Sequence, residues 1–507
     1  MTTTYLDLIN RGAGYYPERT ALVFNGETLT FRQTHVLSNQ LAHALIQRGV
    51  TRGARVALLL NNSLYSVPVD FACVKAGVNR VPLNARLSLD EHRKMLEETG
   101  CELLLYGADL AGRAQELARA LPGLTCHGLG SQDGGGDDLL ADAARQNEGD
   151  PGVQVRADDV ILTLFTSGTT GTLKAAQHTQ ASYAGVCKNV LLNLINVQQD
   201  DAMLHAASLI HASGVFVLPF WLRGARTVIM PAFDPDAFLT LIEQQRITAV
   251  NMVPTMLQML LGHPRFASTD IRHLRQVIYG ASPMPRPVID KAMALWGRER
   301  FWQYYGQTEC PLTIAVLRPE DHDDALLGSC GKPAIEVEIR LVDEAGNDVP
   351  AGEPGEIAVR APSMMAGYHN APALNKEMFM AGGWLRTRDV GQFDSRGFLH
   401  LKDRTSDMII TGGYNVYPRE IEDVLMTHPA VAECAVIGRK DPQWVEAVTA
   451  AVALKPGQQA DETELIAFVA ERVASYKKPR QVIFVDAIPK TAVGKLNRKA
   501  LRETLAE

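Results

Sequence analysis

The sequence lacks the features that mark several broad classes of protein. Its seven cysteines are scattered and none stands in a CxxC pair, which argues against a zinc ribbon or a disulfide framework and favours the reducing cytoplasm. No apolar run approaches the roughly 20 residues of a spanning helix, and no basic segment precedes an apolar one at the start, so no transmembrane segment or signal peptide is predicted. The net charge of -7, without a basic stripe, gives no reason to expect nucleic-acid binding.

What is present is the pattern of an ordinary folded protein with more than one domain. Hydrophobic residues make up 46% and charged residues 21% of the chain, and 507 residues suggest roughly three domains. Short apolar runs alternate with helical patterns, as in the strand predicted at 54–60, the helix at 63–77 and the strand at 79–84. Such alternation is typical of βαβ units in a layered α/β fold.

The pattern changes twice towards the C-terminus. The stretch EVEIRLVDEAGNDVPAGEPGEIAVRA, residues 336–361, alternates with period two and carries turn signals, which predicts antiparallel strands. Helices are then predicted over 420–428 and 461–476, with further strands between and after them. Asp461 and Glu464 suit a capping box at the start of the second helix. The last hundred residues therefore predict a small α/β domain.

The stretch TSGTTGTLK, residues 166–174, directly follows an apolar run that predicts a buried strand. Gly168 and Gly171 permit backbone conformations in which main-chain amides approach an anion closely, and Lys174 adds a cation suited to phosphate. The spacing matches neither GxxxxGK[ST] nor GxGxxG. By itself the stretch fits a phosphate cradle and a tight solvated turn equally well.

Three other stretches occur with this one in a fixed order: YYGQTE at 304–309, the long segment 385–422, and PKTAVGKLNRKAL at 489–501. Together they resemble the acyl-adenylate-forming (AMP-binding) superfamily, in which acyl-CoA synthetases are found, over essentially the whole chain. The resemblance implies a large N-terminal domain at 1–402, with layered α/β subdomains and an antiparallel β section, and a small mobile α/β domain at 403–507.

The same resemblance implies a two-step ligase reaction with ATP, Mg²⁺ and coenzyme A. A carboxylic acid would attack the α-phosphate of ATP and expel pyrophosphate, and the thiol of CoA would then displace AMP from the acyl adenylate. Because two anions must meet in the first step, the site has to supply cations and fixed dipoles. Lys495 would bridge the acyl carboxylate and the α-phosphate, Thr308 would contact that phosphate, and Glu309 would bind the magnesium ion.

Further residues receive roles from the resemblance alone. The β- and γ-phosphates would be held by the glycine-rich stretch: Thr166, Ser167, Gly168, Thr169, Thr170, Gly171 and Lys174. Tyr305 would lie beside the adenine, Asp389 would accept hydrogen bonds from the ribose hydroxyls, and Arg404 would be a cation on the ribose and phosphate side. The segment with Gly280, Ala281 and Ser282 would be shared by the adenine site and the acyl pocket. Gly412 and Gly413 would flank the CoA channel, and His211 would be a gate near the carboxylate. Cys310 is interpreted as a wall of the acid pocket, because nothing in the sequence activates its thiol.

Four positions depart from the family pattern. Leu173 stands where proline is usual, Ala175 and Arg388 where glycine is usual, and Ser406 where lysine is common. The first two alter the stiffness of the loop. Arg388 precedes Asp389, so its side chain either adds a cation near the nucleotide or points outward.

Alternatives remain for the acceptor, the acid and the assembly. The chain is predicted to be a free-standing acid–CoA ligase, with a carrier-protein-loading enzyme and a nucleotide-binding protein without turnover as alternatives. The candidate acid-pocket segments at 209–216, 251–256, 279–284 and 309–314 carry no obvious cation, which favours an apolar aryl or medium-chain acid over a dicarboxylate. A homodimer is one option for the assembly.

Overall fold

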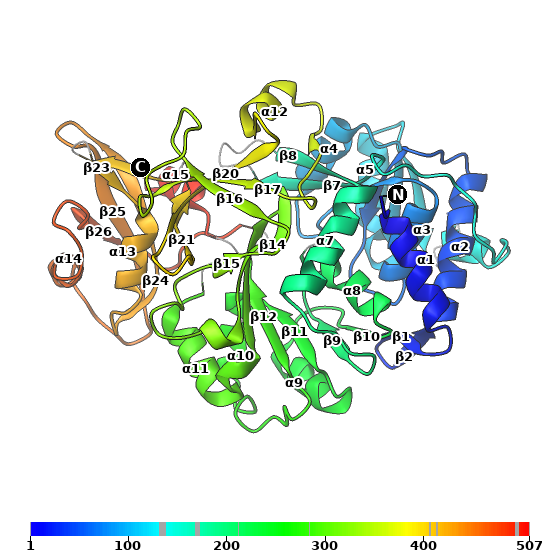
Figure 1. Ribbon diagram of the computed structural model, residues 1–507, viewed down its shortest axis with the longest axis horizontal. Coiled ribbons are helices and arrows are strands. Elements are labelled where there is room, and N and C mark those ends of the chain that lie inside the picture. Colours follow the sequence, from blue (N-terminus) through cyan, green and yellow to red (C-terminus); the bar gives the residue numbers. More distant parts are fainter. Residues whose placement is uncertain are drawn as a thin grey trace.

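The computed structural model describes residues 2–130, 138–167, 173–210, 212–282, 284–404, 407–411, 414–491 and 496–505 (Figure 1). Four sheets organise this part of the chain: two large, mostly parallel sheets, a smaller antiparallel sheet, and a separate C-terminal sheet. The predicted mixed α/β fold, with a large N-terminal part and a small C-terminal part, is confirmed.

The first sheet has the strand order β18-β8-β7-β4-β3-β5-β6. Its strands are β3 (Arg55–Leu59), β4 (Asn79–Pro82), β5 (Leu103–Gly107), β6 (Thr125–Leu129), β7 (Val160–Ser167), β8 (Leu173–Thr179) and β18 (Gly367–Tyr368). Strands β3 to β7 run parallel, whereas β8 returns antiparallel beside β7 and β18 pairs with β8. The βαβ pattern predicted for residues 54–84 is confirmed by β3, α3 and β4.

The second sheet has the order β15-β14-β13-β12-β11-β9-β10-β1-β2. Its strands are β1 (Thr20–Phe24), β2 (Glu27–Thr30), β9 (Ala202–His205), β10 (Arg226–Ile229), β11 (Ala249–Met252), β12 (Gln276–Gly280), β13 (Phe301–Gln307), β14 (Cys310–Leu317) and β15 (Lys332–Pro333). The central strands β13, β12, β11, β9, β10 and β1 are parallel. Their carboxyl ends therefore lie along one edge, where open parallel sheets bind ligands.

Helices cover both large sheets. They are α1 (Tyr5–Tyr15), α2 (Phe31–Gln47), α3 (Ser66–Lys75), α4 (Leu89–Thr99), α5 (Ala111–Ala120), α6 (Leu139–Ala143), α7 (Gln180–Asn193), α8 (Val217–Leu222), α9 (Pro235–Gln244), α10 (Pro254–Leu261) and α11 (Arg286–Trp296). Figure 1 shows α7 between the two sheets. Cys187 of α7 packs with Ile161 of the first sheet, and Val190 packs with Ile278 of the second. Because one helix is buried by both sheets, the two share a continuous apolar layer.

The antiparallel sheet follows in the sequence. It consists of β16 (Glu338–Val342), β17 (Gly355–Arg360), β19 (Phe379–Met380), β20 (Trp384–Phe393) and β21 (Leu399–Arg404), with α12 (Pro372–Met378) beside it. The antiparallel strands predicted for 336–361 are confirmed by the β16–β17 pair. Strand β21 continues through position 402, so the boundary predicted between 402 and 403 falls inside a strand and stays a prediction.

The C-terminal part forms its own small core. It contains β22 (Ile409–Thr411), β23 (Tyr414–Val416), α13 (Pro418–Leu425), β24 (Val431–Asp441), β25 (Val445–Leu454), α14 (Glu462–Ala470), β26 (Gln481–Phe484) and α15 (Arg498–Thr504). Asp461 caps α14 by accepting a hydrogen bond from the Glu464 amide, but the Glu464 carboxylate lies 3.3 Å from His428 Nε2. The predicted capping box is thus half formed.

Helix α14 is shorter than the helix predicted over 461–476. After Ala470 the chain leaves the helix, and the Tyr476 ring stacks on Tyr414 with 4.5 Å between ring centroids. Lys477 then pairs with Glu420 at 2.7 Å. Contacts with another part of the domain therefore end the helix earlier than the local pattern indicates. Over the described ranges, no helix has the length and apolar character needed to cross a membrane.

Candidate active site

The motif YYGQTE forms β13 and the turn into β14, at the carboxyl end of the parallel strands. Gly280, the last residue of β12, pairs in register with Tyr304, and a Cβ atom at Gly280 would collide with the Tyr304 carbonyl oxygen. A Cβ at Gly306 would lie 2.6 Å from the Leu312 backbone. Both glycines are therefore required by close approach of two backbones, which brings the 280–282 segment against the motif.

One half of the site is a buried tyrosine–carboxylate pair. The Tyr305 hydroxyl donates to Asp389 Oδ2 at 2.6 Å, although 84 residues separate the two in sequence. Tyr305 is 7% and Asp389 8% exposed. Burial and the neighbouring Asp389 carboxylate raise the pKa of Tyr305, so its hydroxyl stays a proton donor. Asp389 also pairs in register with Arg404 across β20 and β21, which places three predicted nucleoside-binding residues together.

Asp389 is held in place by the residues just before it. The Thr387 hydroxyl accepts a hydrogen bond from the Asp389 amide and donates to the Ile357 carbonyl. Arg388 has φ of 63°, in the left-handed region, and its amide donates to the buried carboxylate of Glu356. The Arg388 side chain forms an ion pair with Glu377 on α12. An arginine thus occupies the conformation that a glycine adopts without strain.

The other half of the site joins Lys174, Tyr368 and Glu309. Lys174 Nζ lies 5.8 Å from the centroid of the Tyr368 ring, and the Tyr368 hydroxyl donates to Glu309 Oε1 at 2.5 Å. Strand β18 positions Tyr368, because Tyr368 pairs in register with Ala176 of β8. Lys174 itself pairs with Thr166 across the β7–β8 hairpin. Lys174, the end of β7 that carries Thr166, and the Glu309 carboxylate therefore lie close together.

Thr308 lies between these two halves and is held through its backbone. The buried His178 ring donates from Nε2 to the Thr308 carbonyl at 2.8 Å. Burial lowers the pKa of His178 to about 4, so the ring is neutral at physiological pH. A neutral imidazole here fixes the turn without adding a charge next to the Glu309 carboxylate.

Strained backbone conformations flank the same turn. Ala281, Leu312 and Arg388 all have positive φ values, of 65°, 59° and 63°. Each adjoins a predicted site segment: Ala281 lies in the 280–282 segment, Leu312 follows the motif, and Arg388 precedes Asp389. A positive φ strains the backbone of a non-glycine residue. Such residues tend to occur where the surrounding structure enforces a functional geometry.

Several predicted residues cannot be placed. Gly168, Thr169, Thr170, Gly171, His211, Gly412, Gly413 and Lys495 lie outside the described residues, as does Ser406. The backbones of Ser167 and Arg404 are described, within β7 and β21. Leu173 and Ala175 both lie in β8, where Ala175 is buried against the sheet. The roles of all these residues stay predictions.

Two residues of the site have no counterpart among those predictions. Tyr368 and His178 contact Glu309 and Thr308 across 59 and 130 residues of sequence. Neither residue lies in one of the four motif stretches, and a lone tyrosine or histidine in a strand carries no functional signal. Only the pairing of β18 with β8 and of β8 with β7 reveals them.

The prediction that Glu309 binds magnesium and the interpretation of Cys310 as an unactivated pocket wall are both compatible with this geometry. Glu309 offers a hard carboxylate oxygen, and magnesium is typically bound by one or two carboxylates together with substrate phosphates and water. Within the described residues no group of three or more His, Cys, Asp or Glu side chains could hold a metal. A metal at Glu309 would therefore depend on phosphate ligands. Burial raises the pKa of the Cys310 thiol to about 12, so Cys310 is not an activated nucleophile.

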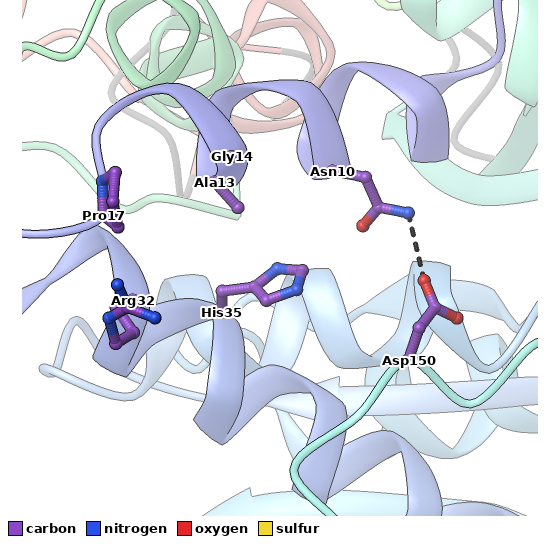
Figure 2. A pocket seen from close by; sticks show the side chains of 7 residues that line it. All are labelled: Asn10, Ala13, Gly14, Pro17, Arg32, His35 and Asp150. Carbon is purple, nitrogen blue, oxygen red and sulfur yellow. Dashed lines mark hydrogen bonds between the residues drawn. The ribbon is translucent and has the colours of Figure 1, made fainter.

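A cavity of about 440 Å³ lies apart from these residues, between α1 and α2 (Figure 2). His35 points into it, and Asn10 donates to Asp150 at 3.2 Å on one side. Lys75 is buried behind His35, with its Nζ 3.0 Å from His35 Nδ1. No predicted site residue lines this cavity, so it does not belong to the candidate active site.

These features define a class of protein: an α/β enzyme with motif residues at the carboxyl ends of parallel strands and a small C-terminal α/β unit. A sequence profile of the AMP-binding enzymes matches residues 9–369, and one of the AMP-binding enzyme C-terminal domain matches residues 420–495. The chain therefore belongs to the AMP-binding enzyme family, as its motifs predicted, and it is an enzyme of the acid–thiol ligase class.

Individual relatives agree with this assignment. Feruloyl-CoA synthase from an Amycolatopsis species is 36% identical, with 97% of this chain and 99% of that protein covered. ATP-bound MatB from Rhodopseudomonas palustris superposes with a TM-score of 0.91 at 30% identity, over 99% of both chains. The amide bond synthetase McbA from Marinactinospora thermotolerans superposes with a TM-score of 0.89 at 31% identity, also over 99% of both chains.

Proposed function

We propose that the protein is an ATP-dependent acid–CoA ligase that forms an acyl adenylate and then an acyl-CoA. The single observation that carries this proposal is that Lys174 of β8, Tyr305 of β13 and Asp389 of β20 converge around the turn that holds Glu309. A cation and a carboxylate on one side suit a metal-bound triphosphate, and a buried carboxylate on the other suits vicinal hydroxyls. The family membership gives this arrangement its chemical meaning.

In the first step the acid carboxylate attacks the α-phosphorus, the bond from that phosphorus to the bridging oxygen breaks, and pyrophosphate leaves. Lys174 offsets charge on the leaving pyrophosphate, and the Thr308 hydroxyl donates to the α-phosphate. Lys495 offsets the charge that accumulates between the carboxylate and the phosphorus. When bound, Mg²⁺ supplies further charge neutralisation at phosphate oxygens, with Glu309 as its protein ligand.

In the second step the CoA thiolate attacks the acyl carbonyl carbon, and AMP departs with the bond electrons. Gly412 and Gly413, which lack side chains, would leave room for the pantetheine arm. The small C-terminal domain, proposed to span 403–507, would move between the steps and withdraw Lys495 from the site. A cytoplasmic location and a homodimeric assembly are also part of the proposal.

We propose an acid with a mainly apolar tail. Three of the four candidate pocket segments contribute to one apolar cluster, through Ala212, Val215, Phe216, Ala281 and Leu312. The relative named feruloyl-CoA synthase acts, by its name, on an aryl acid. An aryl or medium-chain acid would bury its tail against this cluster, which favours binding by the hydrophobic effect.

The experiment is a pyrophosphate-release assay over a panel of acids, run with CoA, with a carrier protein, with an amine and without acceptor. Thioester formation with CoA supports the ligase. If the adenylate forms but its acyl group is transferred to a carrier protein or an amine and not to CoA, the acceptor in the proposal has to be replaced. An amine acceptor is what the name of the neighbouring amide bond synthetase suggests for that enzyme. ATP binding without pyrophosphate release would contradict the proposal altogether.

A further inference from the structure

Two buried polar side chains lie side by side at the carboxyl ends of neighbouring strands. Asn251 is on β11 and His205 ends β9, and the in-register pairs Ala249–Met203 and Val250–Leu204 directly precede them. Met203 and Ala249 pack in the apolar cluster that also contains Ala281. Because strand residues alternate in direction, His205 and Asn251 face the same side as Met203 and Ala249.

Each of these side chains buries a nitrogen for which the described part of the chain offers no hydrogen-bond partner. Asn251 is 7% exposed and His205 1% exposed. His205 Nδ1 lies 2.9 Å from the Ser213 hydroxyl, but His205 Nε2 and Asn251 Nδ2 have no partner among the described residues. Leaving a buried donor or acceptor unpaired destabilises the folded protein, so such atoms are rare without a reason.

The position of the pair supplies a reason. Asn251 pairs in register with Ile278 of β12, two residues before Gly280. The pair is thus one and two strands away from the segment predicted to lie between the adenine and the acid, at the edge where open parallel sheets bind ligands. Met203 and Ala249, which share this face of the sheet, belong to an apolar cluster, so the two nitrogens are polar points beside apolar side chains.

We propose that Asn251 and His205 recognise a hydroxyl group on the tail of the acid, an inference that rests on the proposed ligase function. Asn251 Nδ2 would donate to the hydroxyl oxygen. Burial lowers the pKa of His205 to about 3, so the ring is neutral, and its Nε2 accepts the hydroxyl proton when Nδ1 carries the ring proton towards Ser213. A hydroxyl satisfies both nitrogens at once, whereas a purely hydrocarbon tail leaves both unpaired.

The preceding residue along the same strand offers a matched control. Val250 is buried, like Asn251, but packs in the cluster on the opposite face of the sheet, with Leu204 and Met252. Val250 also lies outside the candidate acid-pocket segments, so a substitution there perturbs the same strand without touching the two nitrogens. Asn251→Leu keeps the branching at Cγ and the number of side-chain heavy atoms, and it removes the amide nitrogen.

The test compares acids in matched pairs that differ by one hydroxyl: benzoate with 4-hydroxybenzoate, cinnamate with 4-hydroxycinnamate, and octanoate with 8-hydroxyoctanoate. In the wild type we expect kcat/KM to favour the hydroxylated member by about 10-fold or more in the pair of the right length. Asn251→Leu and His205→Phe should bring that ratio close to one, and Val250→Ile should leave it unchanged. Asn251→Leu should also melt at the same or a higher temperature.

The outcomes separate this inference from the ligase proposal. If thioesters form but no pair shows a preference for the hydroxyl, or Asn251→Leu leaves the ratio unchanged, the polar recognition is wrong and the ligase stands. If Asn251→Leu lowers the melting temperature markedly, the amide has a partner within the protein and the inference is overturned. If no acid yields a thioester, both fall together.

Discussion

The side of the candidate site proposed to bind the nucleoside and the side proposed to bind the phosphates are held by different kinds of interaction. Tyr305 and Asp389 are both buried and already satisfy each other at 2.6 Å. Lys174 instead faces the ring of Tyr368, and the described part of the chain contains no ion pair that involves it. Neutral hydroxyls can be recognised by exchanging one preformed hydrogen bond for another. A triphosphate requires charge that the protein has not cancelled itself.

The largest effect is expected where charge is most concentrated. Lys495→Ala should lower the rate of adenylate formation by about 10²–10³-fold, because the cation proposed to act at the transferring phosphorus is lost. Thiolysis of supplied acyl adenylate should stay largely intact. Pyrophosphate release and thioester formation, measured separately, check this. An equal fall in both half-reactions would show that the roles are not divided in this way.

The turn between the two sides should respond to acid. The pKa of His178 is lowered to about 4, below its ordinary value of 6.5, so the unfolded chain binds the proton more readily between these values. The contribution of the neutral ring to the free energy of unfolding is fully present above pH 6.5. It falls as the pH drops towards 4, by about 3 kcal/mol in all. We expect the melting temperature of His178→Gln to fall less than that of wild type between pH 7 and 5.

A second buried histidine provides the control. His322 also has its pKa lowered to about 4 by burial, but it bonds the Arg318 carbonyl and the Tyr279 hydroxyl. His322→Gln should reduce the acid sensitivity similarly and leave the kinetics with ATP unchanged. Only His178→Gln should alter kcat, because only His178 holds Thr308. Identical kinetics for the two variants would mean that His178 is purely structural.

The two tyrosines test the comparison most directly, since each loses only a hydroxyl. Tyr305→Phe should raise the KM for ATP by up to about 10-fold, because Asp389 loses a buried donor that orients it. Tyr368→Phe should change the Mg²⁺ concentration needed for half-maximal rate, because its partner is Glu309. Steady-state kinetics with ATP and Mg²⁺ varied independently measure both. If both variants respond alike to Mg²⁺, the division into two sides fails.

The smallest effect concerns the strained residue beside Asp389. Arg388→Gly should stabilise the protein by about 1 kcal/mol, because glycine adopts positive φ without the steric penalty that an arginine incurs. The exposed ion pair with Glu377 contributes little. Arg388→Ala removes the same ion pair and keeps the penalty, so thermal unfolding should rank Gly above Ala. The reverse order would locate the effect in the ion pair.

Much of the fold was predictable because its signals are local. The β3–α3–β4 unit and the β16–β17 pair follow from hydrophobic periodicity, which depends on neighbours a few residues apart. The end of α14 was not predictable in this way, since Tyr476 and Lys477 leave the helix to contact Tyr414 and Glu420. Likewise Glu464 forms a contact with His428 in place of the second half of the capping box.

The residues of the candidate site also fall into two groups: those that motifs in the sequence predicted and those that only contacts between distant segments revealed. Motifs named Tyr305, Glu309 and Asp389 as candidates, but no pattern in the sequence could show that Tyr305 donates to Asp389. His178 and Tyr368 escaped notice altogether, because the contacts that give them a role cross 130 and 59 residues. Arg388 had two possible directions, and its ion pair with Glu377 selects the outward one.

The sequence by itself determined the family, the chemistry-bearing residue types and the order of the strands and helices, because each depends on short stretches of chain. Only the tertiary structure decided which of those residues meet, which conformations are strained, and which polar atoms of Asn251 and His205 have no partner among the residues that the structure describes. The physical reason is that contacts between distant segments are set by how sheets and helices pack, and packing is a property of the whole fold.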